Sequence, residues 1–194
     1  MKKIILLSIV LFFTTLIYAQ CPNAGDNIYY PQLNKFEGTW KYSNGNTEVI
    51  LILKKKHITT NIADSESYQI DKILGVLSVK VNNITVYSNL NDLNSLINDN
   101  NYRCRFVFKK ECDMNNDDLI YCYSHDDIKQ KSITIYVTYQ HTNTPSIHLR
   151  QSNNERFGLI NLDGTVISED LSNPNGTFDP TFTIPNNIVL IKQP

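Results

Sequence analysis

The sequence predicts an all-β fold, an antiparallel β-barrel of about eight to ten strands. Short runs of β-branched and aromatic residues recur along the chain, separated by Asn, Asp and Gly, as is typical of strands joined by turns. Two dipeptides, Asn44-Gly45 and Asn82-Asn83, favour hairpin turns because their residues tolerate positive φ. No run has the length and 3.6-residue period of a long helix.

Residues 1–20 have the pattern of a secretory signal peptide. Lys2 and Lys3 precede an apolar run over residues 4–17, and Ala19 supplies the small residue near the cleavage point. The apolar run is shorter than the roughly 18–20 residues of a membrane span, and no later run approaches that length. We therefore expect an exported protein, periplasmic or secreted, without a membrane span.

The remaining chain, residues 21–194, is predicted to be a single β-barrel domain, long enough to bury a core. Cys21 follows Gln20 rather than a small residue, so no lipid anchor is expected there. The full chain has 18 basic and 19 acidic residues, and removal of Lys2 and Lys3 leaves 16 against 19, a net charge of −3. Because such a surface repels phosphates, nucleic acid is not an expected partner.

The first predicted hairpin turns at Asn44-Gly45. A two-residue turn at this point places Trp40 opposite Val49 and Lys41 opposite Glu48, whose charges attract. One face of the hairpin then carries the apolar side chains Phe36, Trp40, Val49, Leu51 and Leu53. Turn chemistry, charge and burial agree on this arrangement.

The second predicted hairpin turns at Asn82-Asn83 and pairs Val81 with Ile84 and Val79 with Val86. Its apolar face is expected to carry Leu77, Val79, Val81, Ile84 and Val86. Before it, residues 57–63 and 68–73 have the composition of two more strands. After it, residues 89–101 form a polar loop in which Leu93, Leu96 and Ile97 fit one helical turn.

Residues 102–110 alternate sharply and are expected to pair with residues 119–123. One register sets Cys104 opposite Cys122, whereas a slip of one residue sets Phe106 opposite Tyr121 and separates the two cysteines onto different faces. We favour the first register. In an exported protein the four cysteines are disulfide candidates, and their spacing is not that of a zinc site. They are Cys104, Cys122, Cys21 and Cys112.

The last third of the chain continues the pattern. Residues 132–141 and 145–150 form a predicted hairpin. Its apolar faces match only with a loop of three or five residues near Asn143–Pro145. Two short strands follow at 159–162 and 165–168, and a closing strand is predicted at 187–192.

The sequence Phe36-Glu37-Gly38-Thr39-Trp40 resembles the Gly-x-Trp signature of the first strand in lipocalins and related calycin barrels. This resemblance implies that Trp40 packs across the barrel floor and is covered by a basic residue of the last strand. Lys192 is the candidate here, where lipocalins usually have Arg. The whole chain also resembles small exported Gram-negative bacterial proteins of unknown function, with the same opening and a Pro-x-Asn-Ile-Val-Leu-x-Lys ending at 185–192. That second resemblance implies no known activity.

Reactive motifs are scarce in the sequence. The acidic loop at 113–118 lacks the Gly and terminal Glu of an EF-hand, and Ser124-His125-Asp126-Asp127 has turn composition. His141 and His148 are expected on opposite faces of their hairpin. Hydrolase, phosphate-loop and dinucleotide motifs are missing from the sequence. We therefore expect no catalytic residue, metal site or cofactor.

Five aromatic residues are expected to line the barrel interior: Phe36, Trp40, Phe106, Phe108 and Tyr139. A barrel wide enough to leave a cavity would use them to bind a small apolar or amphipathic ligand. This non-enzymatic binding function is our leading hypothesis. The alternatives are a solid-core module that interacts through its surface and a hydrolase whose distant carboxylates no motif marks.

Overall fold

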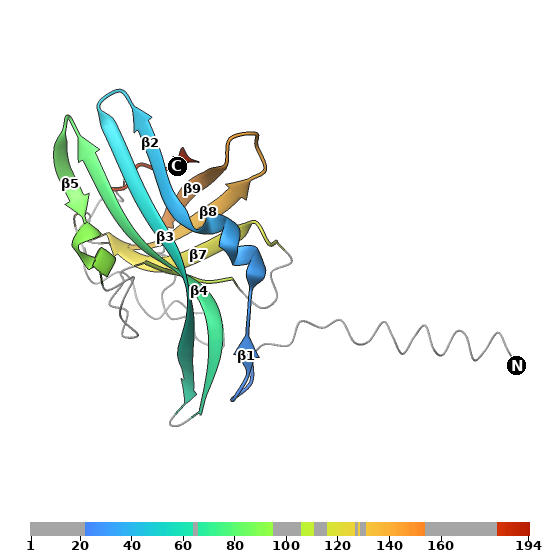
Figure 1. The fold of residues 1–194 in the computed structure, drawn as a ribbon. Helices are drawn as coiled ribbons and strands as arrows, with labels where there is room; N and C mark the ends of the chain where they lie inside the picture. The colour runs from blue at the N-terminus through green and yellow to red at the C-terminus, as the bar shows by residue number, and fades with distance from the viewer. Residues whose placement is uncertain are drawn as a thin grey trace, which may run out of the picture.

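The computed structural model describes residues 22–63, 66–94, 106–110, 116–126, 128, 131–153 and 182–194, which confirm the predicted all-β class. They form one ten-stranded sheet that curls into a half-barrel (Figure 1). The strands are β1 (Asn27–Ile28), β2 (Gly38–Asn44), β3 (Thr47–Ala63), β4 (Glu66–Val81), β5 (Ile84–Ser88), β6 (Phe106–Phe108), β7 (Leu119–Asp126), β8 (Lys131–Gln140), β9 (Ser146–Asn153) and β10 (Ile188–Lys192). Two short 3₁₀ helices, η1 (Pro31–Phe36) and η2 (Leu90–Asp92), accompany them.

The strand order along the sheet is β1-β4-β3-β2-β10-β9-β8-β7. β10 lies between β2 and β9, so the closing strand predicted near the C-terminus joins the first hairpin to the last one. β5 and β6 pair with different parts of β4, and β1 runs parallel to β4. Lys109, directly after β6, bridges to Tyr121 of β7 through two backbone hydrogen bonds. This bridge links the two edges of the curled sheet.

The first hairpin has the predicted faces but a different turn. The turn residues are Gly45 and Asn46, and Trp40 lies opposite Leu51 rather than Val49. Gly45 has φ +57°, and a glycine at the first central position is typical of a type II′ turn. Because the pairing shifts by two residues, the same apolar side chains still share one face.

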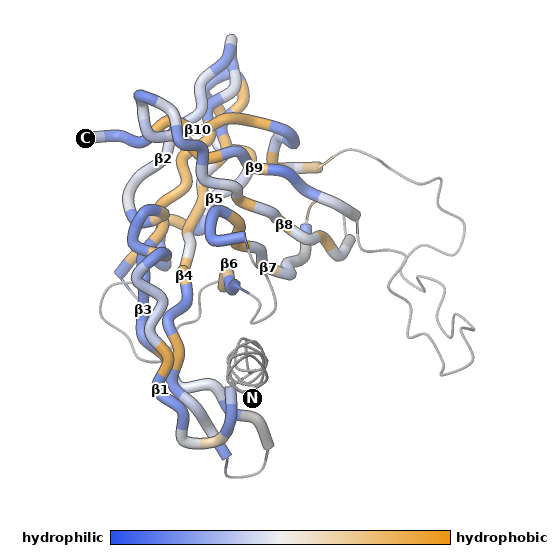
Figure 2. The backbone as a smooth tube through the Cα atoms, turned by 90° about the vertical axis from the view of Figure 1, so that its right-hand side faces the viewer, coloured by the Kyte–Doolittle hydropathy of each residue, from blue (hydrophilic) through white to orange (hydrophobic). Residues whose placement is uncertain are grey.

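β3 and β4 form one continuous long hairpin, so the strands predicted at 57–63 and 68–73 are extensions of their neighbours (Figure 1). The concave face changes character along this hairpin. It carries Leu51 and Leu53 near the middle, and His57 opposite Asp71 farther out. Figure 2 shows this change, since the lower part of β3 is mainly hydrophilic.

The turn between β4 and β5 is the predicted one, with Asn82 and Asn83 at φ +53° and +63° and Val81 opposite Ile84. The predicted apolar face of β5 is wrong, however. A register shift between Val79 and Lys80 pairs Val79 with Tyr87, so Tyr87 packs against the core. Ile84 and Val86 are 68% and 40% exposed.

The predicted pairing of residues 102–110 with β7 is also wrong in register. β6 pairs with β4, placing Phe108 opposite Ile73, and only the Lys109–Tyr121 bridge connects its described continuation to β7. β7 instead pairs along its whole length with β8. Neither predicted register accommodates a Lys109–Tyr121 pair. The β8–β9 hairpin has the five-residue loop that matching apolar faces required, with Val137 opposite Leu149.

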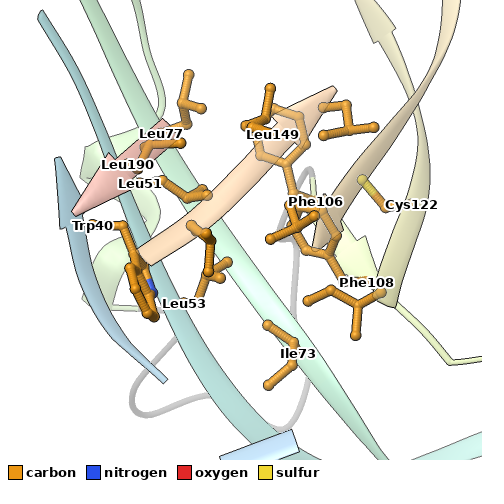
Figure 3. Close-up of a cluster of buried hydrophobic side chains, with 14 of the residues drawn as sticks. Trp40, Leu51, Leu53, Ile73, Leu77, Phe106, Phe108, Cys122, Leu149 and Leu190 are labelled. Carbon is orange, nitrogen blue, oxygen red and sulfur yellow. The ribbon is translucent and has the colours of Figure 1, made fainter. Parts of the chain in front are cut away.

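The core is one contiguous cluster on the concave side of the sheet, drawn in Figure 3. A smaller cluster on the outer side of β4 contains Leu74 and Val76, covered by Leu90 and Leu93. Leu93 is the one described member of the predicted helical turn, since Leu96 and Ile97 lie outside the described residues. The strands predicted at 159–162 and 165–168 lie outside them too.

Candidate functional site

Trp40 is buried at one end of the core cluster, which we call the floor of the half-barrel (Figure 3). Its side chain is 0% exposed, and its Nε1 donates a hydrogen bond to the Phe36 carbonyl at 2.8 Å. Lys192 of β10 lies opposite Trp40, with Nζ 5.2 Å from the ring centroid. The basic residue implied by the lipocalin resemblance is therefore in the expected place.

Gly38 makes room for this arrangement. It has φ +136°, and a Cβ at this position would lie 2.7 Å from Lys192 Cε. A larger residue would therefore push the lysine away from the Trp40 ring and would also strain the backbone.

Tyr139 packs edge-on against both Phe36 and Trp40, with ring centroids 6.0 and 6.3 Å apart. Outside it, Lys35 and Asp118 form an ion pair at 2.5 Å. Asp118 also contacts the His141 ring nitrogen Nε2 at 2.9 Å. The hydrogen bond from Lys35, together with His141, holds the pKa of Asp118 below its usual value. These contacts cap the floor from the solvent side.

Phe106 and Phe108 occupy the middle of the interior on β6, with ring centroids 6.5 Å apart. Gly75 of β4 leaves a bare stretch of backbone under them, because a Cβ there would lie 3.1 Å from Phe108 Cε2. The structure thus brings all five sequence-predicted interior aromatics to one cluster, with Tyr139 at its partly buried margin. At Trp40 and Phe36 the packing leaves no exposed surface.

The end of the interior away from Trp40 carries two polar side chains, Ser124 and Gln151. The turn predicted at Ser124 is wrong, since this residue lies in β7, and sequence reasoning did not single out Gln151. Ser124 follows the core residues Ile120 and Cys122 at a two-residue spacing on β7, and Gln151 follows Leu149 in the same way on β9. Side chains at this spacing share a face. The signal in the sequence was a polar residue continuing an apolar alternation.

Gln151 is held in one orientation. Its side chain is 7% exposed, and Nε2 donates to the Ile184 carbonyl at 2.7 Å. Its buried Oε1 has no hydrogen-bond partner among the described residues, and the same holds for the buried Oγ of Ser124. Asp126, on the same face of β7, accepts hydrogen bonds from the backbone N–H and the hydroxyl of Thr183. This end is therefore polar within an otherwise apolar interior.

A second polar cluster lies on the outer part of the β3–β4 hairpin. Asp71 is 3% exposed and contacts His57 Nδ1 at 2.9 Å, the Tyr30 backbone N–H at 2.9 Å and Lys55 Nζ at 3.4 Å. Burial alone would raise the pKa of Asp71, but these partners outweigh burial and lower the pKa. His57 Nε2 faces Asn27 Oδ1 at 2.6 Å, so the cluster ties β1 to the hairpin.

Cys122 is a buried free thiol, and burial raises its pKa. The predicted Cys104–Cys122 bridge is therefore not formed in this structure. The reason is the register, since β6 pairs with β4 rather than along β7. Cys104, Cys21 and Cys112 lie outside the described residues.

The described part of the acidic loop is used in ion pairs, Asp117 with Lys110 and Asp118 with Lys35. His141 and His148 have different partners, Asp118 and Asn187. Over the residues that can be described, no group of three His, Cys, Asp or Glu side chains is placed to hold a metal ion. Within the same ranges, no helix has the length and apolar composition that a membrane crossing requires.

Comparison with known protein families matches residues 1–193 to the model of a family of unknown function, DUF6705. No curated protein and no solved structure matches the chain.

Proposed function

The chain belongs to DUF6705, a family of unknown function, and from its interior we propose that it binds a small apolar or amphipathic ligand inside the half-barrel. The observation that carries the proposal is the pair of buried, unpartnered polar atoms, Ser124 Oγ and Gln151 Oε1, on strands whose neighbouring positions on the same face belong to the apolar core. Native proteins rarely leave such atoms without a partner, since each costs about 1–3 kcal/mol.

The ligand would bind at the end of the interior away from Trp40. Trp40 and Phe36 have no exposed surface and serve as the packed floor. In this proposal the predicted contact residues divide into two groups. Trp40, Phe36 and Tyr139 support the floor, and Phe106 and Phe108 belong to the apolar wall.

The proposed function is non-enzymatic. Both ring nitrogens of His57 are already engaged, by Asp71 and Asn27, and the described contacts of His141 and His148 engage one nitrogen of each. We propose further that the protein is exported, periplasmic or secreted, on the basis of the signal-peptide pattern over residues 1–20.

A surface interaction module is the second candidate. The observation that favours it is the exposure of Ile84 and Val86 on β5, a strand that pairs with β4 on one side. Apolar residues on an edge strand are available for contact with another protein.

Native mass spectrometry of the full-length gene product, purified from its own source, tests the binding function. We expect an added mass that remains at low collision energy and is lost on denaturation. Protein unfolded, extracted with organic solvent and refolded is the matched control and should lack that mass. An identical, ligand-free mass in both samples, together with failure of the refolded protein to take up 1-octanol or methyl octanoate, would favour the surface module instead.

A further inference from the structure

We infer that the ligand is a neutral amphipathic molecule that donates a hydrogen bond from a hydroxyl or amide group to Gln151. The inference rests on the proposed binding function and adds to it the chemistry of the ligand's polar end. Its apolar part would lie among the buried side chains of the same concave face.

The orientation of the Gln151 amide makes its buried, unpartnered atom an acceptor. Nε2 lies 2.7 Å from the Ile184 carbonyl oxygen and 3.4 Å from that of Pro185, so this atom must be the nitrogen. A flipped amide would set its oxygen against two carbonyl oxygens. Oε1 is therefore the buried atom left without a partner, and it can be satisfied only by a donor.

The backbone around Gln151 fixes this geometry. The Gln151 N–H donates to Asn186 Oδ1 at 2.6 Å, and Asn186 Nδ2 donates to the Gln151 carbonyl at 3.2 Å. The segment containing Ile184 is thus held against β9, and Ile184 itself belongs to the buried core. An acceptor positioned by four hydrogen bonds does not need to reorganise when a donor arrives.

The neighbouring groups argue against an anionic ligand. Asp126 lies on the same face as Ser124, and Thr183 already donates two hydrogen bonds to its carboxylate. An ionised carboxylate placed at this end has no hydrogen to donate to Gln151 Oε1, and its charge would be costly to bury. A hydroxyl or an amide satisfies Gln151 without burying a charge. The Ser124 hydroxyl can donate or accept, so it suits a second polar atom of the same ligand.

Four probes of equal chain length test the inference by isothermal titration calorimetry on the full chain. They are 1-octanol, octanamide, methyl octanoate, which has no donor, and octanoate, which is anionic. We expect 1-octanol and octanamide to bind about tenfold more tightly than the other two, the factor that one hydrogen bond in a buried site provides.

Two variants assign the preference to its residues. Gln151→Met removes the acceptor at similar volume and should reduce the preference for 1-octanol over methyl octanoate to less than about threefold. Ser124→Ala should weaken the binding of octanamide, which has a second polar atom, without lowering stability, because it replaces an unpartnered hydroxyl by a hydrogen. Ser43→Ala, at an exposed position of β2, is the control and should change neither quantity.

The outcomes distinguish the hydrogen bond to Gln151 from ligand binding itself. Equal binding of 1-octanol and methyl octanoate, or a preference that survives in Gln151→Met, would overturn the inference and leave the binding function standing. If none of the four probes binds the wild-type chain, the binding function itself is overturned.

Discussion

The Lys192 ammonium lies 5.2 Å from the centroid of the Trp40 ring, and the two residues are directly opposite each other on β10 and β2. This contact joins the last strand of the chain to the first hairpin. It also explains why a glycine occupies position 38, since the aliphatic part of the lysine fills the space that a side chain would need.

Replacement of Trp40 by Ala should lower the free energy of unfolding by about 3–5 kcal/mol, because it removes a large, fully buried side chain. Urea unfolding followed by circular dichroism measures the change. Tyr123→Ala, at an exposed aromatic position, should stay within about 0.5 kcal/mol of the wild type. A loss below about 1 kcal/mol for Trp40→Ala would contradict the floor assignment.

Gly38→Ala should be more destabilising than Gly25→Ala. Both glycines have positive φ, but only the Cβ at position 38 meets another residue, Lys192. The backbone strain of about 1–3 kcal/mol is common to both, and displacement of the lysine adds about 0.5–1 kcal/mol at Gly38. In a Lys192→Ala background this extra cost should disappear. An unchanged difference there would mean that the lysine has no part in it.

Asp71→Asn should destabilise the protein by about 1–3 kcal/mol at pH 7, because the buried carboxylate accepts hydrogen bonds from three partners. The folded-state pKa of Asp71 lies below its ordinary value of 3.8. The stabilisation is therefore fully present above that value and is lost as the pH falls through the folded-state pKa.

Urea unfolding of the wild type and Asp71→Asn at pH 7 and pH 3 should accordingly show a smaller difference at pH 3. Asp117→Asn is the matched control, since it removes an exposed ion pair with Lys110 and should cost less than about 1 kcal/mol. A difference that grows toward low pH would contradict the assigned direction.

Cys122 should resist alkylation in the folded protein. Its thiol is buried and its pKa is raised, so little reactive thiolate is present at pH 8. Iodoacetamide labelling followed by peptide mass mapping should modify Cys122 only after unfolding in urea. A Cys122 peptide recovered in a disulfide from native protein would contradict the free thiol.

The faces of the strands could be predicted from the sequence better than their pairing. Apolar and polar residues alternate along the first hairpin, which places Trp40, Leu51 and Leu53 on one face. A pairing shift of two residues keeps each side chain on its face, so the displaced turn did not change the concave face. The Trp40–Lys192 contact could also be anticipated, because the signature residues and a basic residue in the closing strand are both visible in the chain.

The pairing of β6 with β4 could not be predicted in the same way. It depends on Gly75, whose lack of a side chain makes room for Phe108 on a strand far away in sequence. The register shift between Val79 and Lys80, which exposes Val86 and turns Tyr87 inward, likewise has no local marker. The positions of Ser124 and Gln151 could have been found in the sequence, because each continues a run of apolar residues at two-residue spacing. The orientation of the Gln151 amide could not, because it depends on a hydrogen bond to Ile184, which is distant in sequence.

The strands of the half-barrel are not all joined by the same number of backbone hydrogen bonds, and the Lys109–Tyr121 bridge is a short link. β3 and β4 are joined along nearly their full length, whereas the described link between β6's continuation and β7 consists of two hydrogen bonds. Lys109 also contacts the Tyr121 and Tyr123 rings, but the ladder of backbone hydrogen bonds is far shorter here than between β3 and β4. We therefore expect local opening to begin at this seam. Opening at this seam would give a small molecule a route to the interior that leaves the Trp40 floor in place.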